Sequence, residues 1–304
     1  MSFVDPIFWV IVFGGMLRLA TPIFLAALGE MITERSGTLN LGIDGIMTAG
    51  AFSAVVCAQA LGWQAGLLGA ALTGALYGLV VAFVVVKAGA NQIIAGIAIS
   101  LVGTGLTSFL FQVWQPSGDT AIFVPLAPNV IVPYLSTIPL IGPVLFKQNL
   151  ITYGALLILC IAVWLFKYTK LGLVLRAVGD GAAAAEMRGI NTDRVRMVAI
   201  TVGGCLMGLG GAAITLGFLG SYNDGLTNGR GYVALAVVII GRWSPVGALA
   251  GAFLFAFFDS LSLRIQDGIS FLPNEAFSIL PYAMTLLVLV ATARSKIAPR
   301  ELGK

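Results

Sequence analysis

The chain has 304 residues, of which 59% are hydrophobic and only 10% are charged. A soluble domain carries about 25% charged residues, so this chain has too few charges to cover a surface that faces water. We therefore expect an all-α integral membrane protein, since no strands of alternating polarity are evident. The net charge of +4 does not indicate nucleic-acid binding, because the cations lie at the ends of hydrophobic segments, where they act as topology signals.

Hydrophobicity divides the chain into about nine segments, which predicts a helical bundle of about 8–10 transmembrane segments in a single domain, 1–304. The segments are roughly 7–28, 41–60, 64–86, 91–113, 150–166, 197–219, 230–242, 245–263 and 276–293. The segment 230–242 is too short to cross a membrane alone. It is either half a helix or one arm of a re-entrant pair with 245–263, broken at Ser244 and Pro245.

The cations are divided unevenly between the two sets of loops. One set holds Arg35, Lys87, Lys167, Lys170, Arg176, Arg188, Arg194, Arg196, Arg242, Arg294, Lys296, Arg300 and Lys304. The other holds Lys147, Arg264 and, if the segment 230–242 begins on that side, Arg230. The positive-inside rule then places the N-terminus outside, the C-terminus inside, the proline-rich loop 114–149 outside and the loop 167–196 in the cytoplasm. Arg18 lies within the first segment, and tilting of that helix would bring it to the inner interface.

Small residues recur at a spacing of four in three of the segments. Such faces let helix backbones approach closely in a membrane. The faces are Gly66, Ala70, Gly74 and Gly78; Gly204, Gly208 and Ala212; and Gly247 with Gly251.

A polar, glycine-rich stretch from Glu34 to Met47 interrupts the apolar sequence. Charge and irregular backbone are costly in a membrane unless they are buried in protein or line a watery path, so this stretch predicts a broken element beside a transport pathway. A second interruption, 225–245, lies in the other half of the chain. Corresponding interruptions in two halves indicate an internal repeat and point to a transport site. For Glu34 and Arg35, structural anchoring is favoured over an ion pair at the cytoplasmic mouth.

Five polar residues near the apolar boundaries are candidates for a substrate pathway, and each has a structural alternative. Asn40 and Asp44 could instead satisfy backbone groups that are freed where the helix is broken. Asn91 and Gln92 open a segment and could be helix caps. Arg230 could hold substrate, meet a binding protein or extend to lipid headgroups.

The loop 167–196 contains a short run of strong helix formers, Ala182 to Arg188, followed by Gly189, which is a natural stop for a helix. Asn191 or Thr192 could cap the helix that follows. A short helix at the cytoplasmic face with small side chains on one side suits docking into the groove of a partner protein. An ordinary interhelical loop remains the alternative.

Two of these stretches resemble motifs of one family. The first is Glu34-Arg35-Ser36-Gly37 followed by Leu39-Asn40-Leu41-Gly42-Ile43-Asp44-Gly45. It resembles the signature of the membrane subunits of ATP-binding-cassette (ABC) importers for branched-chain amino acids, ribose-type sugars and nucleosides, although that family usually has Glu where Asp44 stands. The second is Leu175-Arg176-Ala177-Val178-Gly179, with Ala185-Glu186 and Gly189-Ile190-Asn191 after it. It resembles the coupling loop of the same family, which contacts the ATPase subunit.

Two further motifs resemble the branch of that family that handles nucleosides and simple sugars. One is Gly229-Arg230-Gly231-Tyr232-Val233-Ala234-Leu235-Ala236 with Gly241-Arg242-Trp243-Ser244-Pro245-Val246-Gly247. The other is Asn91-Gln92-Ile93-Ile94-Ala95-Gly96. The resemblance extends over nearly the whole chain, 30–293.

The resemblance implies the permease subunit of an ATP-driven importer, of the nucleoside type, in a bacterial inner (plasma) membrane. Its implied partners are ABC ATPase subunits, a second permease chain that is identical or paralogous, an extracytoplasmic substrate-binding protein and membrane lipid. The residues implied to contact the ATPase are Arg176, Gly179, Glu186, Gly189, Ile190, Asn191 and Arg194. We expect no catalytic residue and no cofactor here; ATP and Mg would bind the partner subunit, because the chain lacks the G-x-x-x-x-G-K-S/T phosphate loop.

Two other functions stay open at this stage. One is an importer permease for simple sugars. The other is an ion- or proton-coupled carrier or channel, which needs paired carboxylates inside the membrane. Asp44 and Asp259 are the acidic candidates, and the sequence shows no partner for either. An enzyme has little support, because the chain has no histidine, no metal-ligand spacing and no nucleophile motif.

Overall fold

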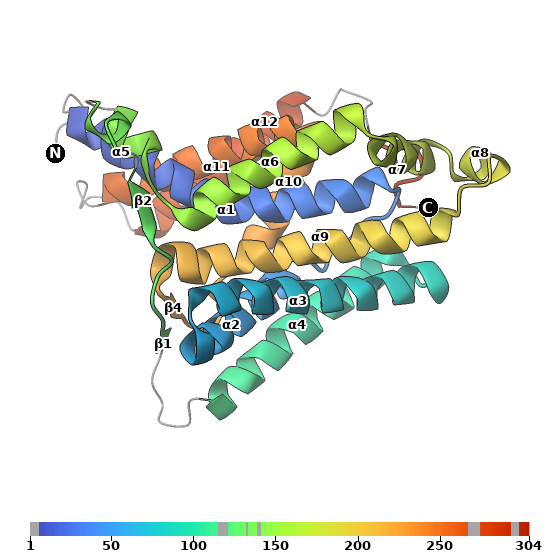
Figure 1. Ribbon diagram of the computed structural model, residues 1–304, viewed down its shortest axis with the longest axis horizontal. Coiled ribbons are helices and arrows are strands. Elements are labelled where there is room, and N and C mark those ends of the chain that lie inside the picture. Colours follow the sequence, from blue (N-terminus) through green and yellow to red (C-terminus); the bar gives the residue numbers. More distant parts are fainter. Residues whose placement is uncertain are drawn as a thin grey trace.

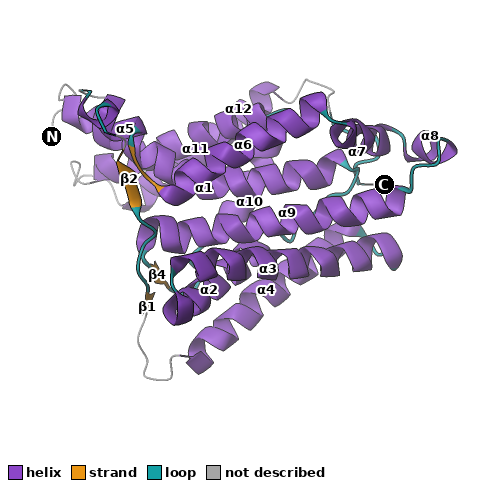
Figure 2. Ribbon diagram, in the orientation of Figure 1, coloured by secondary structure: helices purple, strands orange, loops and turns teal. Residues whose placement is uncertain are grey.

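The architecture is that of a computed structural model, which describes residues 6–114, 121–131, 133–138, 141–266, 274–292 and 298–303. Long helices run side by side, and short strands gather at one end of the bundle (Figures 1 and 2). The elements in chain order are α1 (Pro6–Arg35), α2 (Ile43–Leu61), α3 (Trp63–Ala82), η1 (Phe83–Lys87), α4 (Gln92–Trp114), β1 (Ile122–Phe123), β2 (Asn129–Ile131), η2 (Leu135–Thr137), α5 (Ile141–Leu145), β3 (Lys147–Asn149), α6 (Leu150–Tyr168), α7 (Lys170–Asp180), α8 (Ala182–Met187), α9 (Thr192–Ile214), η3 (Thr215–Leu219), β4 (Ser221–Tyr222), α10 (Arg230–Ile240), α11 (Pro245–Gln266) and α12 (Asn274–Thr292).

The predicted polytopic all-α membrane fold is confirmed. Each of the nine predicted segments contains a helix. Within the described part of the chain, seven helices are long and apolar enough to cross a membrane, namely Pro6–Arg35, Ile43–Leu61, Trp63–Lys87, Gln92–Trp114, Leu150–Tyr168, Thr192–Leu219 and Pro245–Gln266. Helix α10 has 11 residues and is about 16 Å long, which is half a membrane thickness. It is therefore the half helix that the sequence left as one of two possibilities.

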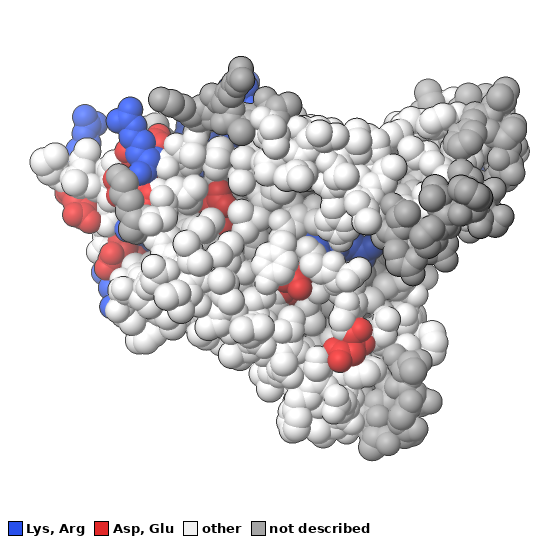
Figure 3. Space-filling model, turned by 180° about the vertical axis from the view of Figure 1, so that it is seen from behind, with Lys and Arg blue, Asp and Glu red and all other residues white. Residues whose placement is uncertain are grey.

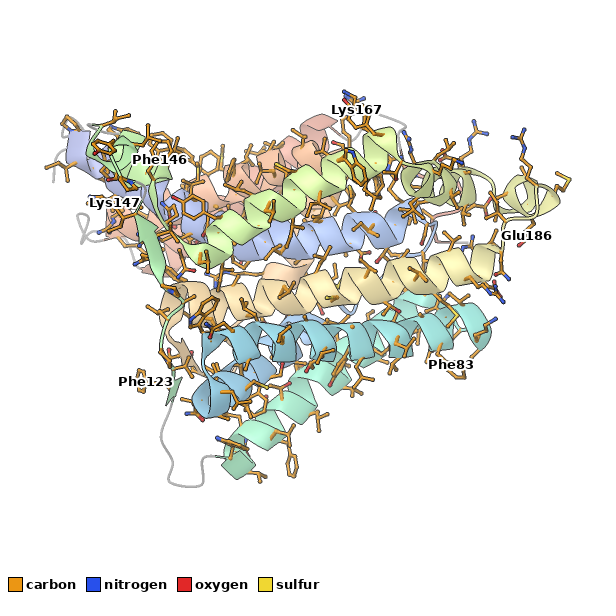
Figure 4. All side chains as sticks on the ribbon, viewed as in Figure 1. Phe83, Phe123, Phe146, Lys147, Lys167 and Glu186 are labelled. Carbon is orange, nitrogen blue, oxygen red and sulfur yellow. The ribbon has the colours of Figure 1, made fainter. Side chains whose placement is uncertain are left out.

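The bundle has two distinct ends, which we call the sheet end and the α7–α8 end. At the sheet end β1 pairs antiparallel with β4, with Ile122 opposite Tyr222, and β2 pairs antiparallel with β3. Helix α1 begins at this end, whereas α7, α8 and the last described residues, 298–303, lie at the other (Figure 1). Lys147 and Lys167, just before the first turn of α6 and in its last turn, mark the two ends (Figure 4).

The charged side chains on the rear face gather at the α7–α8 end (Figure 3). This is the end where the sequence places most of its cations, although Arg294, Lys296 and Lys304 lie outside the described residues, as do Pro116 and Pro139 of the 114–149 loop. Which end faces the cytoplasm stays a prediction.

Arg18 contacts the sheet end of the bundle. Its Nε donates to the Oε1 of Gln148, in β3, over 3.4 Å. That tilting of the first helix brings Arg18 to the inner interface stays a prediction, because it depends on which end faces the cytoplasm. An acceptor in the sheet, rather than the lipid interface, holds the guanidinium.

The predicted small faces bring helix backbones together. Gly66, Ala70, Gly74 and Gly78 are among the buried residues of α3. Gly74 and Gly78 lie directly against Gly204 of α9. The third face packs α11 on α10, because Gly247 meets Gly241 and Gly251 meets Val237. Close backbone contact of this kind stabilises helix pairs where lipid supplies no hydrophobic driving force.

Helix α1 is longer than predicted, and the broken element after it is shorter. The helix continues to Arg35 rather than ending near 28, and α2 begins at Ile43, so the irregular backbone covers 36–42. Gly37 ends α1 with a left-handed φ of 89°, and the Thr38 N–H donates to the Thr33 carbonyl over 3.4 Å. This is the usual glycine-based helix stop. The prediction ended α1 too early because polar residues were counted as a membrane boundary, whereas here they are buried in protein.

Candidate functional site

The two polar interruptions meet inside the bundle at Asp44. This residue lies in the first turn of α2 and is 8% exposed. Its Oδ1 accepts a hydrogen bond from the Gly231 N–H over 3.1 Å, and its Oδ2 accepts one from the Thr227 hydroxyl over 3.2 Å. The Thr227 hydroxyl also lies 2.9 Å from that of Thr48. A carboxylate from the first half of the chain thus caps the N-terminus of α10 in the second half, where the helix dipole favours negative charge.

Gly231 allows this contact because it has no side chain. A Cβ added there would lie 2.5 Å from both Cα and N of Asp44. Real Cβ atoms do not approach backbone so closely, so any larger residue would push α10 away from α2. The glycine at 231 in this motif is therefore explained by packing at the start of α10.

Arg230 lies beside this contact and pairs with Asp259 of α11. One Nη of Arg230 is 3.7 Å from the Asp259 Oδ2, and the two side chains are 22% and 18% exposed. Arg230 therefore faces an acidic residue within the bundle, and the side of the membrane on which α10 begins stays a prediction. Both acidic residues that seemed unpartnered in the sequence have partners within the bundle.

Hydroxyl groups extend the site between α4, α10 and α12. The Ser100 Oγ accepts from the Gly45 N–H over 3.1 Å and lies 3.3 Å from the Tyr232 hydroxyl, and the Tyr282 hydroxyl donates to the Asn228 carbonyl over 3.5 Å. Both tyrosines are partly exposed. We call this set the polar cluster: Asp44, Thr48, Ser100, Thr227, Arg230, Tyr232, Asp259 and Tyr282. Isolated charged atoms interrupt the otherwise uncharged middle of the rear face (Figure 3).

Sequence reasoning missed several members of the polar cluster. Thr227 and Tyr232 lie within the interruption 225–245 and could have been found there as polar residues of a broken element. Ser100 and Thr48 give no such signal, because isolated hydroxyl residues are common within transmembrane helices and bond to their own backbone.

The segment that leads into the polar cluster is anchored by Tyr222 at the sheet end. Its fully buried ring packs against Phe52 of α2 and Phe111 of α4, with ring centroids 5.4 and 5.5 Å away. Burial raises the pKa of the Tyr222 hydroxyl, and the nearby Asp224 carboxylate raises it further. The hydroxyl is therefore neutral at physiological pH, and the ring acts as a hydrophobic anchor.

At the α7–α8 end, Glu34 and Arg35 both bind Trp243 rather than each other. The Trp243 indole N–H donates to the Glu34 carboxylate, and the Arg35 Nε donates to the Trp243 carbonyl over 2.8 Å. Trp243 is 7% exposed and Glu34 is 1% exposed. These contacts fit structural anchoring, which the sequence favoured for this pair.

Side chains from three elements hold the irregular backbone of 36–42. Glu30 is fully buried, and its Oε1 accepts from the Asn40 N–H over 2.9 Å. The Asn40 Oδ1 accepts from the Gly42 N–H over 2.9 Å, and the Gln92 Oε1 accepts from the Leu39 N–H over 2.7 Å. Asn40 therefore has the backbone-satisfying role that was one of its two alternatives. Glu30 was missed because it lies just past the predicted end of its helix, where an acidic residue is unremarkable.

The five candidate pathway residues fall in two places. Asp44 and Arg230 lie in the polar cluster, and Asn40 lies in the broken segment beside it. Asn91 caps α4, since its Oδ1 accepts from the N–H groups of Ile93 and Ile94 over 3.0 and 3.2 Å. Asn91 and Gln92 border a cavity of about 280 Å³ at the α7–α8 end, which is also lined by Thr38, Asp193, Arg196 and Gly303.

The loop 167–196 has the local structure that its sequence predicted. Helix α8 ends at Met187; Gly189 follows with a left-handed φ of 79°, and the Ile190 N–H donates to the Ala185 carbonyl over 3.1 Å. Asn191 caps α9 through its Oδ1, which accepts from the Arg194 N–H over 2.9 Å. The predicted short helix, its stop and the following cap are confirmed.

Within this loop, some of the predicted contact residues face outward and others hold the loop in place. Glu186 is exposed at the far end of the bundle (Figure 4), where its Oε1 accepts from the Thr192 hydroxyl at the start of α9 over 2.5 Å. Arg176 donates to the carbonyls of Phe166 and Gly172 over 3.0 and 3.1 Å. Gly179 is buried against α1.

The apolar helices and the polar cluster between them are typical of a multi-pass membrane transport protein. The chain belongs to the family described as the branched-chain amino acid transport system / permease component, whose model matches residues 12–289. It is a permease subunit of the ABC importer class and a multi-pass inner-membrane protein.

Three relatives illustrate the range of named substrates. The nucleoside ABC transporter permease NupC of Lactococcus lactis is 35% identical over 96% of this chain and 95% of its own length. The guanosine ABC transporter permease NupQ of Bacillus subtilis is 32% identical over 93% and 92%. The putative glucose ABC transporter permease TsgC13 of Haloferax volcanii is 37% identical over 83% and 76%.

Proposed function

We propose that this permease imports nucleosides, with a second permease chain completing the pathway and separate ATPase subunits supplying the energy. The observation that carries the proposal is the meeting of both interrupted elements at Asp44, between the long apolar helices of the bundle. Interrupted helices that meet near the membrane midplane are the usual place for a transport site.

The chemistry of the polar cluster suits a nucleoside. The carboxylates of Asp44 and Asp259 can accept hydrogen bonds from ribose hydroxyls, and the hydroxyls around them can both donate and accept. The rings of Tyr232 and Tyr282 are partly exposed beside them and can stack on a flat base. Two relatives that are more than 30% identical and match over more than nine-tenths of their own length are named for nucleosides or guanosine.

The α7–α8 end is the proposed docking surface for the ATPase, and hence the cytoplasmic end. The residues proposed to contact or position that subunit are Arg176, Gly179, Glu186, Gly189, Ile190, Asn191 and Arg194. Support comes from α8, which projects beyond the bundle and carries Met187 at 84% exposure (Figure 1). A short projecting helix with an exposed apolar residue fits a hydrophobic groove in a partner.

We infer that the second permease is a paralogue rather than another copy of this chain. In each of three organisms, two relatives carry names for the same substrate and match this chain unequally. The pairs are NupC and NupB at 35% and 24%, NupQ and NupP at 32% and 25%, and TsgC13 and TsgB13 at 37% and 27%. This chain then corresponds to the first member of each pair, and a chain of the second type would be its partner.

Glucose import is the alternative with specific support, because TsgC13 is the most identical of the three quoted relatives. A coupled carrier has less support, since Asp44 and Asp259 are each held by a basic or hydrogen-bonding partner within the bundle.

The test is uptake by the complete transporter in proteoliposomes, with the chain purified from its native host together with whatever it binds. Radiolabelled guanosine, uridine and glucose are compared with ATP inside or outside the vesicles. We expect ATP-dependent uptake of a nucleoside that excess unlabelled nucleoside suppresses. Uptake of glucose alone would establish the sugar alternative, and uptake without ATP would establish the carrier.

A further inference from the structure

Helix α10 is fastened at both ends to elements of the first half of the chain. Its N-terminus rests on α2 through the hydrogen bond from Gly231 to Asp44. Its C-terminus is followed by a turn that two consecutive residues of α1 hold, Glu34 and Arg35. Because α10 is a single short helix, a displacement at one end is transmitted to the other with little bending.

The turn after α10 is strained. Arg242 and Trp243 have left-handed φ values of 54° and 52°, and the Trp243 N–H donates to the Val238 carbonyl over 3.2 Å. Glycine is the usual residue in such a helix stop, and residues with side chains adopt this conformation at a cost that surrounding contacts must offset. The contacts here are the Glu34 carboxylate on the indole N–H and the Arg35 guanidinium on the Trp243 carbonyl.

The same end of α1 is in direct contact with the coupling loop. Gly179 of α7 lies so close to Arg35 that an added Cβ would be 3.0 Å from the Arg35 carbonyl carbon and 3.3 Å from the Gly37 nitrogen. The carbonyl of Gly179 also accepts from the Glu301 N–H over 3.0 Å. A continuous series of contacts therefore runs from α7 through the end of α1 to Trp243, and along α10 to the polar cluster.

We propose that Trp243 is the joint through which movement of α7 reaches the polar cluster. This inference rests on the proposed docking of an ATPase at α7–α8. Displacement of α7 shifts the end of α1, Glu34 and Arg35 carry Trp243 with it, and α10 moves against Asp44. Trp243 is then a positioning residue, and its indole N–H is the group that links it to Glu34 of α1.

The test uses a reporter on α10 in the complete transporter. The cysteines Cys57, Cys160 and Cys205 are replaced by serine, and Ala236→Cys is introduced at a half-buried position of α10 outside the polar cluster. The purified assembly, in lipid nanodiscs, is labelled with a maleimide, with and without ATP and vanadate. When Trp243 and Glu34 are unaltered, we expect ATP and vanadate to change the labelling rate by about tenfold. The reason is that they shift α10 between two positions in which the cysteine is differently exposed.

Trp243→Phe keeps the ring and removes the N–H donor. We expect it to reduce the ATP-dependent change at least threefold, roughly the effect of losing an ordinary hydrogen bond, with unchanged recovery of the ATPase subunit. The matched control is Trp164→Phe on α6, where the side chain is 60% exposed, and it should leave the change intact. Glu34→Gln is the second variant: the amide oxygen can still accept from the indole, so the fold is preserved while the charge is lost.

An ATP-dependent change that persists in full in Trp243→Phe would overturn the proposal, as would a loss in Glu34→Gln, which keeps the acceptor, that exceeds the loss in Trp243→Phe, or a labelling rate that ATP never alters. The assay needs no substrate. Failure to import nucleosides would therefore refute the proposed function and leave this test unaffected.

Discussion

Replacing Gly231 with alanine should separate α10 from Asp44. The added Cβ would lie 2.5 Å from the Cα and N of Asp44 and 2.8 Å from its Cβ. Two of these three atoms belong to the backbone of α2, so no side-chain rotation relieves the clash. The helix must move by about an ångström, since ordinary contacts lie at about 3.5–4.0 Å. The 3.1 Å hydrogen bond between Gly231 and Asp44 then lengthens beyond a useful distance.

The energy at stake is several kcal/mol. A hydrogen bond to a charged group contributes about 1.5–3 kcal/mol, and overpacking of a close contact costs about 1–3 kcal/mol. The sum is less than the total stability of about 5–15 kcal/mol that is typical of a folded domain. We therefore expect Gly231→Ala to insert and to bind the ATPase, with the displacement confined to α10.

The assay is ATP-dependent guanosine uptake in proteoliposomes. We expect Gly231→Ala to lower the initial rate by at least about tenfold, since a disturbance of 1.4 kcal/mol is sufficient for that factor. Gly154→Ala on α6 is the matched control, because an added Cβ there meets nothing within 4 Å. Uptake by Gly231→Ala at the control rate would refute the assignment of this contact to the pathway.

Three further predictions test the remaining parts of the site. Asp44→Asn keeps the shape but removes the charge that faces the N-terminus of α10; its ATP-dependent uptake should fall about threefold or more, and an unchanged rate would remove Asp44 from the pathway. Arg230→Gln and Asp259→Asn should each impair uptake, while the double variant should lose less than the product of the two; independent effects would show that the pair is not coupled. Gly189→Val strains the left-handed end of α8. It should lower ATPase recovery on co-purification while the permease still inserts, and full recovery would contradict the docking assignment.

The parts of this fold that were predictable are those fixed by local sequence. Runs of apolar residues gave the helices, and Gly66, Gly74 and Gly204 gave the close faces between α3 and α9. Gly189 and Asn191 gave the end of α8 and the start of α9, because helix stops and caps depend on one or two residues.

The unpredicted parts depend on contacts between distant residues. Hydropathy measures transfer to lipid, but Glu30 and Glu34 are transferred to protein, where Asn40 and Trp243 donate to them. Nothing near Asp44 in the sequence indicates that the N–H of Gly231 will meet it. For the same reason the pairing of Arg230 with Asp259 was not predicted: the length of 230–242 indicated a half helix but not which residues of α11 it would meet.

Each interruption supplies what the other lacks. A helix that begins inside a membrane bundle exposes N–H groups that lipid cannot satisfy, and Asp44 accepts from one of them. A carboxylate at that depth is costly by itself, and the N-terminus of α10 together with Thr227 offsets the cost. Neither element would be stable there alone, which explains why both breaks occur in one chain. It also suits transport, because hydroxyls of a substrate that enters the polar cluster can replace Thr227 or Gly231 as hydrogen-bond donors to the Asp44 carboxylate while that charge stays away from lipid.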